Sequence, residues 1–397
     1  MSNFVVVAAM WRVNIISFRK EQMMSTAIST PYRYDVVGSF LRPKRLHDAR
    51  KHFEAGNIGK EELVSVEDAA ITELVAKEKA AGLHVITDGE FRRATWHLDF
   101  MWQLGGIPHQ KTRTGLPFHG EQAMIDDTFL TGKICPAAHH SFVDHFRFTN
   151  SFSDATTVAK QTIPAPAQTF AQFAMPFALG NTRKYYKTDQ DLIDDIAVAY
   201  RVVIDELYQA GCRNLQFDDC TWPMTVDKSA PEMWDTDEAG LRKVREKLLC
   251  ANNLVLEGLP ADLTVNTHIC RGNFHSTYAC SGPYDDVADY VLAREHVHAF
   301  FLEFADERSG GFAPLAKVPE DKLVVLGLIT TKSAALEDKD AVIARISQAK
   351  AYVPLRRLCL SPQCGFASCE IGNKLTEDQQ WAKVRLVRDI AKEVWGE

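Results

Sequence analysis

A histidine and a cysteine two positions apart stand at the end of an apolar run in the second half of the chain. The run includes Leu263 and Val265, it leads to His268 and Cys270, and Gly272 then signals a turn. Residues two apart in a β-strand point to the same face. The imidazole and the thiol would therefore leave the strand together, as one nitrogen and one sulfur ligand of the kinds that zinc accepts.

Further residues of metal-binding types stand near the ends of other apolar runs. Glu303 ends one run, and Cys364 follows another in the stretch SPQCGF. Cys220, Cys359 and Cys369 are competing candidates, although Cys359 alternates with apolar neighbours, which favours core packing. A His-x-Cys pair arises often by chance and free cysteine is commonly buried. Spacing alone therefore leaves both a metal site and core packing open.

The candidate ligands sit in an alternation of short apolar runs and amphipathic segments. The predicted strands cover residues 35–39, 84–88, 160–164, 214–218, 263–268, 298–303, 322–328 and 356–361. The predicted helices cover residues 60–81, 188–210, 236–257, 284–297, 338–351 and 376–395. Strands that alternate with helices pair in parallel through crossovers, and eight such units predict a closed (βα)8 TIM barrel. A doubly wound sheet is the alternative, but no glycine-rich dinucleotide motif follows the first strand.

One stretch, residues 100–160, fits this alternation poorly. It contains turn residues, aromatics and five histidines: His109, His119, His139, His140 and His145. We predict a long insertion between the second and third strands, with histidines that are solvated or locally packed because their spacing is irregular. Residues 1–30 are predicted to be an appendage, and residues 31–397 a single barrel domain.

The C-terminal ends of the predicted strands hold most of the polar candidates, and this is where barrel enzymes keep their active sites. These ends carry Ser39, Asp88, Glu90, Asp218, His268, Cys270, Glu303, Lys332 and Cys364. Carboxylates on this rim would hold a cationic group such as an α-ammonium, and Ser39 would hold a carboxylate. Asp88 and Asp218 have an alternative role as caps of the helices that follow.

Composition limits the class of protein. The chain has 46% apolar and 24% charged residues and a net charge of −7, which argues against a nucleic-acid-binding surface. No apolar run approaches the roughly 18–20 residues that cross a bilayer. Nine cysteines without paired spacing indicate reduced thiols in a cytoplasmic protein.

The rim motifs resemble a known enzyme family. The stretches DVVGSFLRP, TDGEFRR, LQFDD, THIC and SPQCGF, together with Glu303, are similar to the catalytic half of the cobalamin-independent methionine synthases. The similarity spans about residues 31–395 and is closest to the shorter single-barrel members, with a barrel of the methionine synthase and uroporphyrinogen decarboxylase type. It implies Zn²⁺ bound by His268, Cys270, Glu303 and Cys364. It further implies that Val37, Gly38, Ser39, Glu90 and Asp218 hold the homocysteine backbone.

The resemblance implies methyl transfer to a zinc-activated thiol, with homocysteine as the acceptor and methyl-folate or a methyl-corrinoid as the donor. Glu303 would be the ligand that yields to the substrate sulfur. Two departures from the full-length enzymes concern the donor side. The chain lacks room for their additional N-terminal barrel, and LITTKS places Thr330 and Lys332 where those enzymes have an Asp-x-His pair. Lys332 would then donate a proton or hold an anion. Association into a homo-oligomer is compatible with this reading.

Three other functions stay open at this stage. An epoxyalkane:coenzyme M transferase uses a similar zinc barrel, but Glu90 and Asp218 favour an acceptor that carries an ammonium group. A metal-free decarboxylase of the uroporphyrinogen type would have no use for His268, Cys270 and Cys364 together. A non-catalytic binding barrel is disfavoured because all four predicted ligands are intact.

Overall fold

The computed structural model describes residues 30–112 and 115–396, so the predicted appendage at residues 1–30 lies outside this part except for its last residue. The helices are α2 (Lys44–Glu54), α3 (Lys60–Ala80), α4 (Leu98–Met101), α5 (Ser141–Asn150), α6 (Pro166–Ala174), α7 (Pro176–Thr182), α8 (Asp189–Gln209), α9 (Ala230–Met233), α10 (Glu238–Leu256), α11 (Val291–Arg294), α12 (Lys339–Ala349) and α13 (Glu377–Trp395). The strands are β1 (Val85–Ile86), β2 (His109–Gln110), β3 (Leu116–Phe118), β4 (Glu121–Ala123), β5 (Asp127–Thr128), β6 (Val158–Ala159), β7 (Gln161–Pro164), β8 (Asn214–Asp219), β9 (Thr264–Ile269), β10 (Ala299–Glu303), β11 (Leu323–Ile329) and β12 (Leu358–Pro362).

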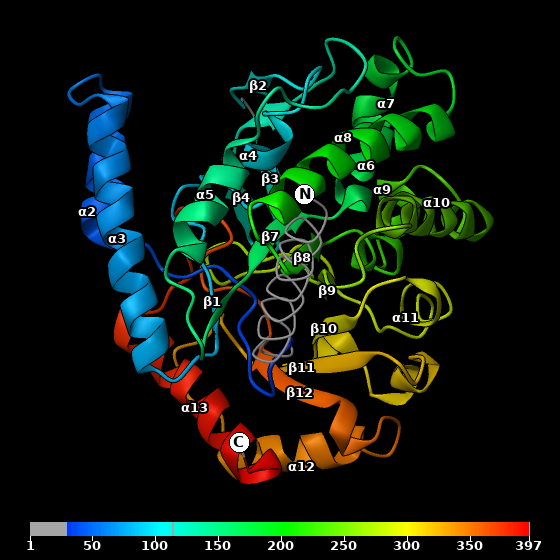
Figure 1. Cartoon of the computed structure of the whole chain (residues 1–397). Helices are drawn as coiled ribbons and strands as arrows, with labels where there is room; N and C mark the ends of the chain where they lie inside the picture. Colours follow the sequence, from blue (N-terminus) through cyan, green and yellow to red (C-terminus); the bar gives the residue numbers. More distant parts are fainter. Residues whose placement is uncertain (1–29, 113–114, 397) are drawn as a thin grey trace, which may run out of the picture.

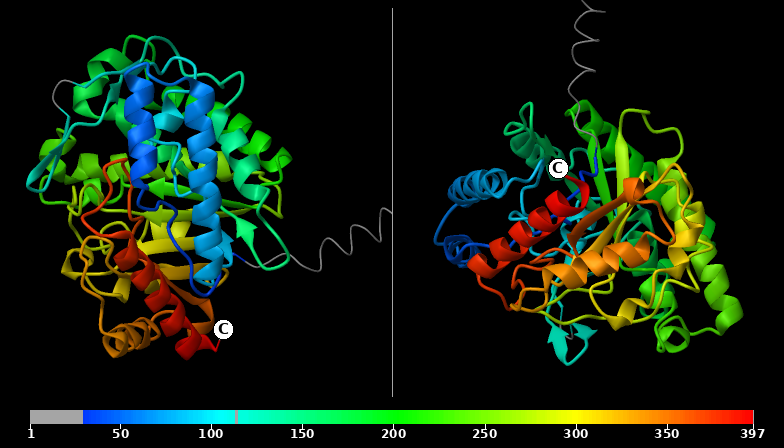
Figure 2. Two further views of the ribbon diagram at one scale, coloured as in Figure 1. Left: turned by 90° about the vertical axis from the view of Figure 1, so that its left-hand side faces the viewer. Right: turned by 90° about the horizontal axis from the view of Figure 1, so that it is seen from below.

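Six consecutive strands form one parallel sheet in the order β12-β11-β10-β9-β8-β7. Helices α8, α10 and α12 are crossovers between successive strands of this sheet. The strands lie in the middle of the molecule and the long helices surround them (Figure 1). Helices α12 and α13 pack against each other, and α13 also packs on β12 (Figure 2). Each strand is thereby covered on its outer face, as parallel sheets require.

Two further strand positions close this sheet into a ring. Strand β1 pairs in parallel with β6, and the backbone N–H of Lys160, between β6 and β7, donates to the carbonyl of Ile86 at 2.9 Å. On the other side, the backbone N–H of Asp35 donates to the carbonyl of Leu360 in β12 at 3.0 Å. The fold is therefore the predicted (βα)8 TIM barrel, with the segment before residue 40 in the first strand position.

The prediction of a regular first strand at 35–39 is wrong, because only Tyr34 makes a ladder bridge there. The carbonyls of Val37 and Gly38 accept hydrogen bonds from the side chains of Gln216 and Thr87, at 2.8 and 2.7 Å. The backbone groups that would pair with a neighbouring strand are thus bound by side chains. The chain turns here toward the mouth of the barrel.

The predicted helix at 284–297 is also wrong over most of its length, since only α11 is helical. The carbonyl of Gly282 accepts a hydrogen bond from the guanidinium of Arg271 at 2.8 Å, and Tyr284 is buried beside that guanidinium, with its hydroxyl 2.9 Å from Arg271 Nη1. These contacts hold the segment as a series of turns. The other five predicted helices agree with the structure within about two residues at each end.

Residues 100–160 lie between β1 and β7 and contain two small antiparallel pairs, β2 with β5 and β3 with β4. The β3–β4 pair contacts the loop after β9: the ring centroids of Phe118 and Phe274 are 5.2 Å apart, and Glu121 pairs with His275 at 2.9 Å. Two histidines of this stretch, His109 and His139, pair with acidic side chains. The candidate metal-binding groups found in the described residues include none of its histidines. The single-domain organisation itself stays a prediction.

The barrel interior contains a buried ion pair. Lys160 Nζ lies 3.0 Å from Asp35 Oδ1, and neither side chain is more than 1% exposed. Lys160 also donates to the carbonyl of Val36, so it fixes the chain just before the turn at Val37. Burial raises the pKa of Asp35, while Lys160 opposes this shift.

Among the described residues no helix is both long enough and apolar enough to cross a membrane.

Lys160→Met is expected to lower the free energy of unfolding by about 3 kcal/mol, because it leaves a buried carboxylate without its cation. Urea denaturation measures this change. The double variant Asp35→Asn/Lys160→Met removes both charges and should recover part of the loss. Lys44→Met, which breaks the exposed pair with Asp48, is the control and should change stability by less than about 0.5 kcal/mol. An equal loss in single and double variants would contradict the assignment.

Candidate metal centre

Three neighbouring strands bring polar side chains to the same edge of the barrel. In the register of β8 and β9, Asp218 lies beside His268 and Asp219 beside Ile269, and the backbone N–H of Cys270 donates to the carbonyl of Asp219 at 2.9 Å. The register of β9 and β10 pairs Ile269 with Leu302. Cys220, Cys270 and Glu303 each come directly after the last of these pairs. Because residues two apart share a face, these side chains form two short rows that point toward the mouth of the barrel.

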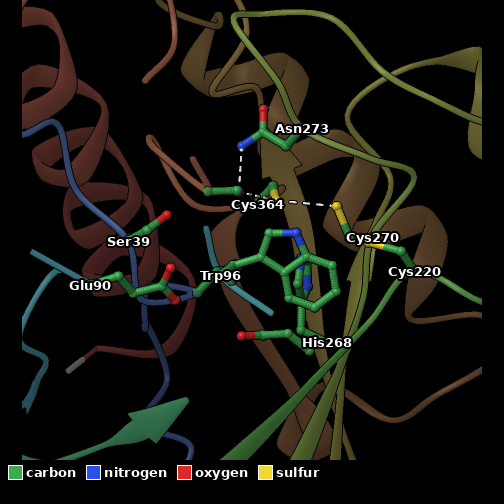
Figure 3. Close-up of a pocket in the computed structure, with 11 residues that line it drawn as sticks. Ser39, Glu90, Trp96, Cys220, His268, Cys270, Asn273 and Cys364 are labelled. Carbon is green, nitrogen blue, oxygen red and sulfur yellow. Dashed lines mark hydrogen bonds between the residues drawn. The ribbon is translucent and has the colours of Figure 1, made fainter. Parts of the chain in front are cut away.

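His268, Cys270 and Cys364 form a compact group of potential metal ligands. One donor atom from each lies within 4.8 Å of the other two, and all three residues are buried. The two sulfur atoms are 3.3 Å apart. In Figure 3 the Cys270 thiol points toward Cys364 from the adjacent loop. In the part of the chain that the structure describes, it is the one group of at least three His, Cys, Asp or Glu side chains close enough to share a metal ion.

The imidazole of His268 is oriented so that its Nε2 could bind a metal ion. Its Nδ1 lies 3.3 Å from the carbonyl of Phe301 in β10, which favours the tautomer with the proton on Nδ1. Its Nε2 is buried, and no hydrogen-bond partner for it is found among the described residues. A buried nitrogen acceptor without a partner is costly, and a metal ion between it and the two thiols would satisfy it. These residues therefore fit a zinc ion.

The two thiols have strongly perturbed acidities. The pKa of Cys270 is raised well above its usual value, first by a hydrogen bond with Cys220 and then by burial. The pKa of Cys364 is raised by its hydrogen bond with Cys270 and by burial. A divalent cation in contact with both sulfurs would lower the pKa of both thiols, because it stabilises the thiolates directly.

Glu303, the predicted fourth ligand, is held differently. Its carboxylate is fully buried and pairs with Arg308 Nη2 at 2.8 Å, and its other oxygen accepts the backbone N–H of Arg271 at 3.3 Å. It is not part of the group formed by the two thiols and the imidazole. Ligation by Glu303 stays a prediction.

Two buried carboxyls lie near the metal group, Asp218 beside His268 in the adjacent strand and Glu90 across the pocket. Glu90 and Asp218 both line the pocket that contains His268, Cys270 and Cys364, and Figure 3 shows Glu90 beside Ser39, across from the thiols. Burial raises the pKa of Glu90 and of Asp218 to about 7 each. Glu90 Oε1 accepts a hydrogen bond from Thr162 at 3.0 Å and lies 3.4 Å from Arg93, while its Oε2 has no partner among the described residues.

The first-strand residues also reach the pocket. Val37 and Ser39 line it, and Gly38 lies between them with its α-carbon against Thr162, whose methyl group would be 2.8 Å from an added Cβ. The hydroxyl of Ser39 accepts the backbone N–H of Ala367 at 3.3 Å. This contact depends on Gly365, since a Cβ there would lie 1.9 Å from Ser39 Oγ. The glycine after Cys364 therefore lets the first and last strand positions meet.

Four predicted site residues are not among those that line this pocket: Gly38, Asp88, Glu303 and Lys332. Asp88 Oδ1 accepts the backbone N–H of Glu90 at 2.8 Å, so Asp88 shapes the turn that presents Glu90. Lys332 Nζ lies 3.3 Å from Asn273 Oδ1, and Asn273 does line the pocket. Lys332 is thus separated from the pocket by one side chain.

Four residues that line the pocket were not in the predicted site: Trp96, Cys220, Asn273 and Ser368. Of these, Cys220 had been considered as a competing ligand. Asn273 donates to the carbonyl of Gly365 at 2.7 Å and to Ser368 at 3.1 Å, and so ties the loop after β9 to the loop after β12. Trp96 follows the TDGEFRR stretch, and its indole was identifiable only as one aromatic among many. Cys359 packs with Phe301 and Val325, as predicted.

Residues 178–393, more than half of the chain, match the family described as the cobalamin-independent synthase catalytic domain. The chain belongs to this family. The matched range contains β8 to β12 and with them all three residues of the metal group. Membership supports a methyltransferase and confirms the resemblance that the sequence motifs indicated.

Matches to individual proteins extend over nearly the whole chain. Uncharacterized protein YxjG of Bacillus subtilis (strain 168) is 41% identical over 368 residues, which cover 92% of this chain and 95% of the relative. A methionine synthase of Saccharolobus solfataricus is 24% identical over 336 residues, 83% of this chain and 87% of the relative. A solved structure from Listeria monocytogenes, whose name assigns it provisionally to the vitamin-B12-independent methionine synthases, has a TM-score of 0.73 and 35% identity, covering 94% of this chain and all of that one.

Gly365→Ala is expected to destabilise the protein by about 1–3 kcal/mol and to displace Ser39, because the new methyl group overlaps the hydroxyl of Ser39. Thermal unfolding measures the first effect. Gly311→Ala, where a Cβ has no atom within 4 Å, is the matched control and should leave stability nearly unchanged. Equal stability of the two variants would contradict the close approach at Ser39.

Proposed function

We propose that the protein is a zinc-dependent thiol alkyltransferase that transfers a methyl group to homocysteine. The observation that carries this proposal is the buried group of His268, Cys270 and Cys364, with an imidazole nitrogen and two thiols within 4.8 Å of one another. Nitrogen and sulfur donors at this number and spacing suit zinc with a fourth, exchangeable position. Bound zinc would hold a substrate thiol as a nucleophilic thiolate near neutral pH.

The acceptor is inferred from the two carboxyls that line the pocket together with the metal group. Glu90 and Asp218 are buried carboxyls with raised pKa values, and an ammonium group placed between them would restore their negative charge and pair with it. The hydroxyl of Ser39 and the backbone at Val37 and Gly38 are suited to the carboxylate of the same molecule. An α-amino acid with a thiol on a short side chain fits both requirements, and homocysteine is such a molecule.

The chain's own residues would act mainly by positioning. Glu90 and Asp218 fix the amino-acid end, so that the thiol reaches the group formed by His268, Cys270 and Cys364, and fixing both ends of a substrate converts a slow encounter into an intramolecular step. Asp88 would support this indirectly through the turn that carries Glu90.

The methyl donor would approach from the open side of the pocket, past Asn273 and Trp96. Lys332, which contacts Asn273, is proposed to hold an anionic group of the donor or to donate a proton to the leaving group. A methyl-folate and a methyl-corrinoid are both compatible with this role. Nine cysteines without paired spacing suit a reducing compartment such as the cytoplasm, which is where we propose that the protein acts.

Elemental analysis of protein purified without added metal tests the proposal. We expect about one zinc ion per chain in the wild type and a large loss in Cys364→Ala, because the variant lacks one of the three ligands. Cys250→Ser, which changes a partly exposed cysteine of α10, is the control and should keep its zinc. A folded wild-type protein without metal would contradict the proposal and favour a metal-free reaction or a binding role.

Glu90→Gln tests the acceptor. Because a hydrogen bond to a charged group contributes about 1.5–3 kcal/mol, we expect the KM for homocysteine to rise about 10- to 100-fold, with little change for a sulfonate thiol such as coenzyme M. Both acceptors are assayed with a methyl-folate and with a methyl-corrinoid donor. Glu61→Gln, on the exposed first turn of α3, is the control. Transfer by the wild type only to the sulfonate thiol would contradict homocysteine as the acceptor.

A further inference from the structure

Uncharged polar side chains lie next to the pocket in the barrel interior without lining it. Gln216 stands two residues before Asp218 in β8, and Thr162 of β7 is its neighbour in the sheet register. Both side chains are buried, and Gln216 has no exposed surface. Residues two apart on a strand share a face and fill successive layers of a barrel. Gln216 therefore lies one layer below Asp218, beneath the pocket.

The amide group of Gln216 joins two parts of the pocket that are distant in the sequence. Its Nε2 donates to Asp218 Oδ1 and to the carbonyl of Val37, both at 2.8 Å. An amide nitrogen has two hydrogens, so these two contacts use both. Because both oxygens lie 2.8 Å from the same nitrogen, one side chain fixes where the carboxyl of Asp218 lies relative to the backbone at Val37.

The same contact sets the direction of a backbone N–H group. The peptide bond after Val37 is trans, and in a trans peptide the carbonyl and the next N–H point in opposite directions. With the carbonyl of Val37 held by Gln216, the N–H of Gly38 points away from Gln216. Thr87 holds the carbonyl of Gly38 at 2.7 Å and orients the N–H of Ser39 in the same way. Neither N–H has a backbone acceptor within the described part of the chain, so both can bind an anion.

Thr162 supports one of these two subsites. Its hydroxyl donates to Glu90 Oε1 at 3.0 Å, while Glu90 Oε2 has no partner in the described structure and remains for a ligand. Thr162 thus orients a carboxyl that we assign to the ammonium group. Gln216 differs from it because its amide contacts both the carboxyl of Asp218 and the peptide that we assign to the carboxylate.

We propose that Gln216 is a positioning residue for the acceptor and that it sets the spacing between the ammonium and carboxylate subsites. A fixed spacing selects molecules that carry both groups on one carbon atom, as α-amino acids do. This inference rests on the proposed function and adds the residue that makes the site specific for an α-amino acid. Gln216 would act through Asp218 and the Val37–Gly38 peptide, without touching the substrate.

Calorimetric titration of the zinc-loaded full-length protein tests this with three ligands: L-homocysteine, its analogue without the ammonium group and its analogue without the carboxylate. In Gln216→Met, which keeps the length of the side chain and removes both hydrogen bonds, we expect the Kd for homocysteine to rise about 10- to 100-fold. The Kd of each analogue should change by less than about 3-fold, because a molecule with one charged group can shift to follow a displaced subsite.

Gln380→Met is the matched control. Gln380 is a buried glutamine of α13 whose Oε1 accepts the backbone N–H of Leu41 at 2.7 Å, so its loss also releases the segment after the first strand position. We expect lower thermal stability and an unchanged ratio of the three Kd values. An equal weakening of all three ligands in Gln216→Met, or an unchanged Kd for homocysteine, would show that Gln216 only stabilises the fold.

A second titration does not depend on the folding of any variant. In the wild type, we expect the β-homologue of homocysteine, with one methylene inserted between the ammonium-bearing carbon and the carboxylate, to bind at least about 10-fold more weakly than homocysteine. Equal binding of the two would overturn the fixed spacing and leave homocysteine as an acceptor. A wild-type zinc protein that does not bind homocysteine would instead contradict the proposed function, and this inference with it.

Discussion

The backbone register of β8, β9 and β10 is the constraint on which the site depends. Side chains alternate between the two faces of a strand, so a slip of one residue between β8 and β9 would move Cys270 away from Cys220 and turn the imidazole of His268 to the other face. The register is fixed by hydrogen bonds along six consecutive residue pairs between β8 and β9. The chemistry thus depends on interactions far from the mouth of the barrel.

Closure of the barrel adds the second half of the site. Cys364 comes from the loop after β12 and Ser39 from the first strand position, and these two segments meet because Gly365 has no side chain. Asn273 then joins the loop after β9 to the loop after β12 through the carbonyl of Gly365. Cys364, Ser39 and the loop after β9 are therefore held by one continuous set of contacts, which keeps these parts of the pocket in place before any ligand binds.

Sequence reasoning located the parts of the site that follow from periodicity. His268 and Cys270 were identified because residues two apart share a face of a strand, and the eight alternating units correctly indicated the barrel. The same reasoning failed at 35–39, where side chains of Gln216 and Thr87 satisfy the backbone, and at 284–297, where Arg271 and Tyr284 hold turns. Both failures come from side-chain contacts to the backbone, which a pattern of apolar and polar residues does not contain. The pairing of Glu303 with Arg308, five residues further along the chain, is likewise not visible in that pattern.

The two walls of the pocket are built on different supports. The metal group lies at or just after strand ends, whose positions are set by the sheet, whereas Trp96 and Asn273 lie on loops beyond the strands, as does Lys332, which contacts Asn273. Loops tolerate change better than paired strands do. The loop residues of the pocket can therefore change without disturbing the register of the sheet that holds the metal group.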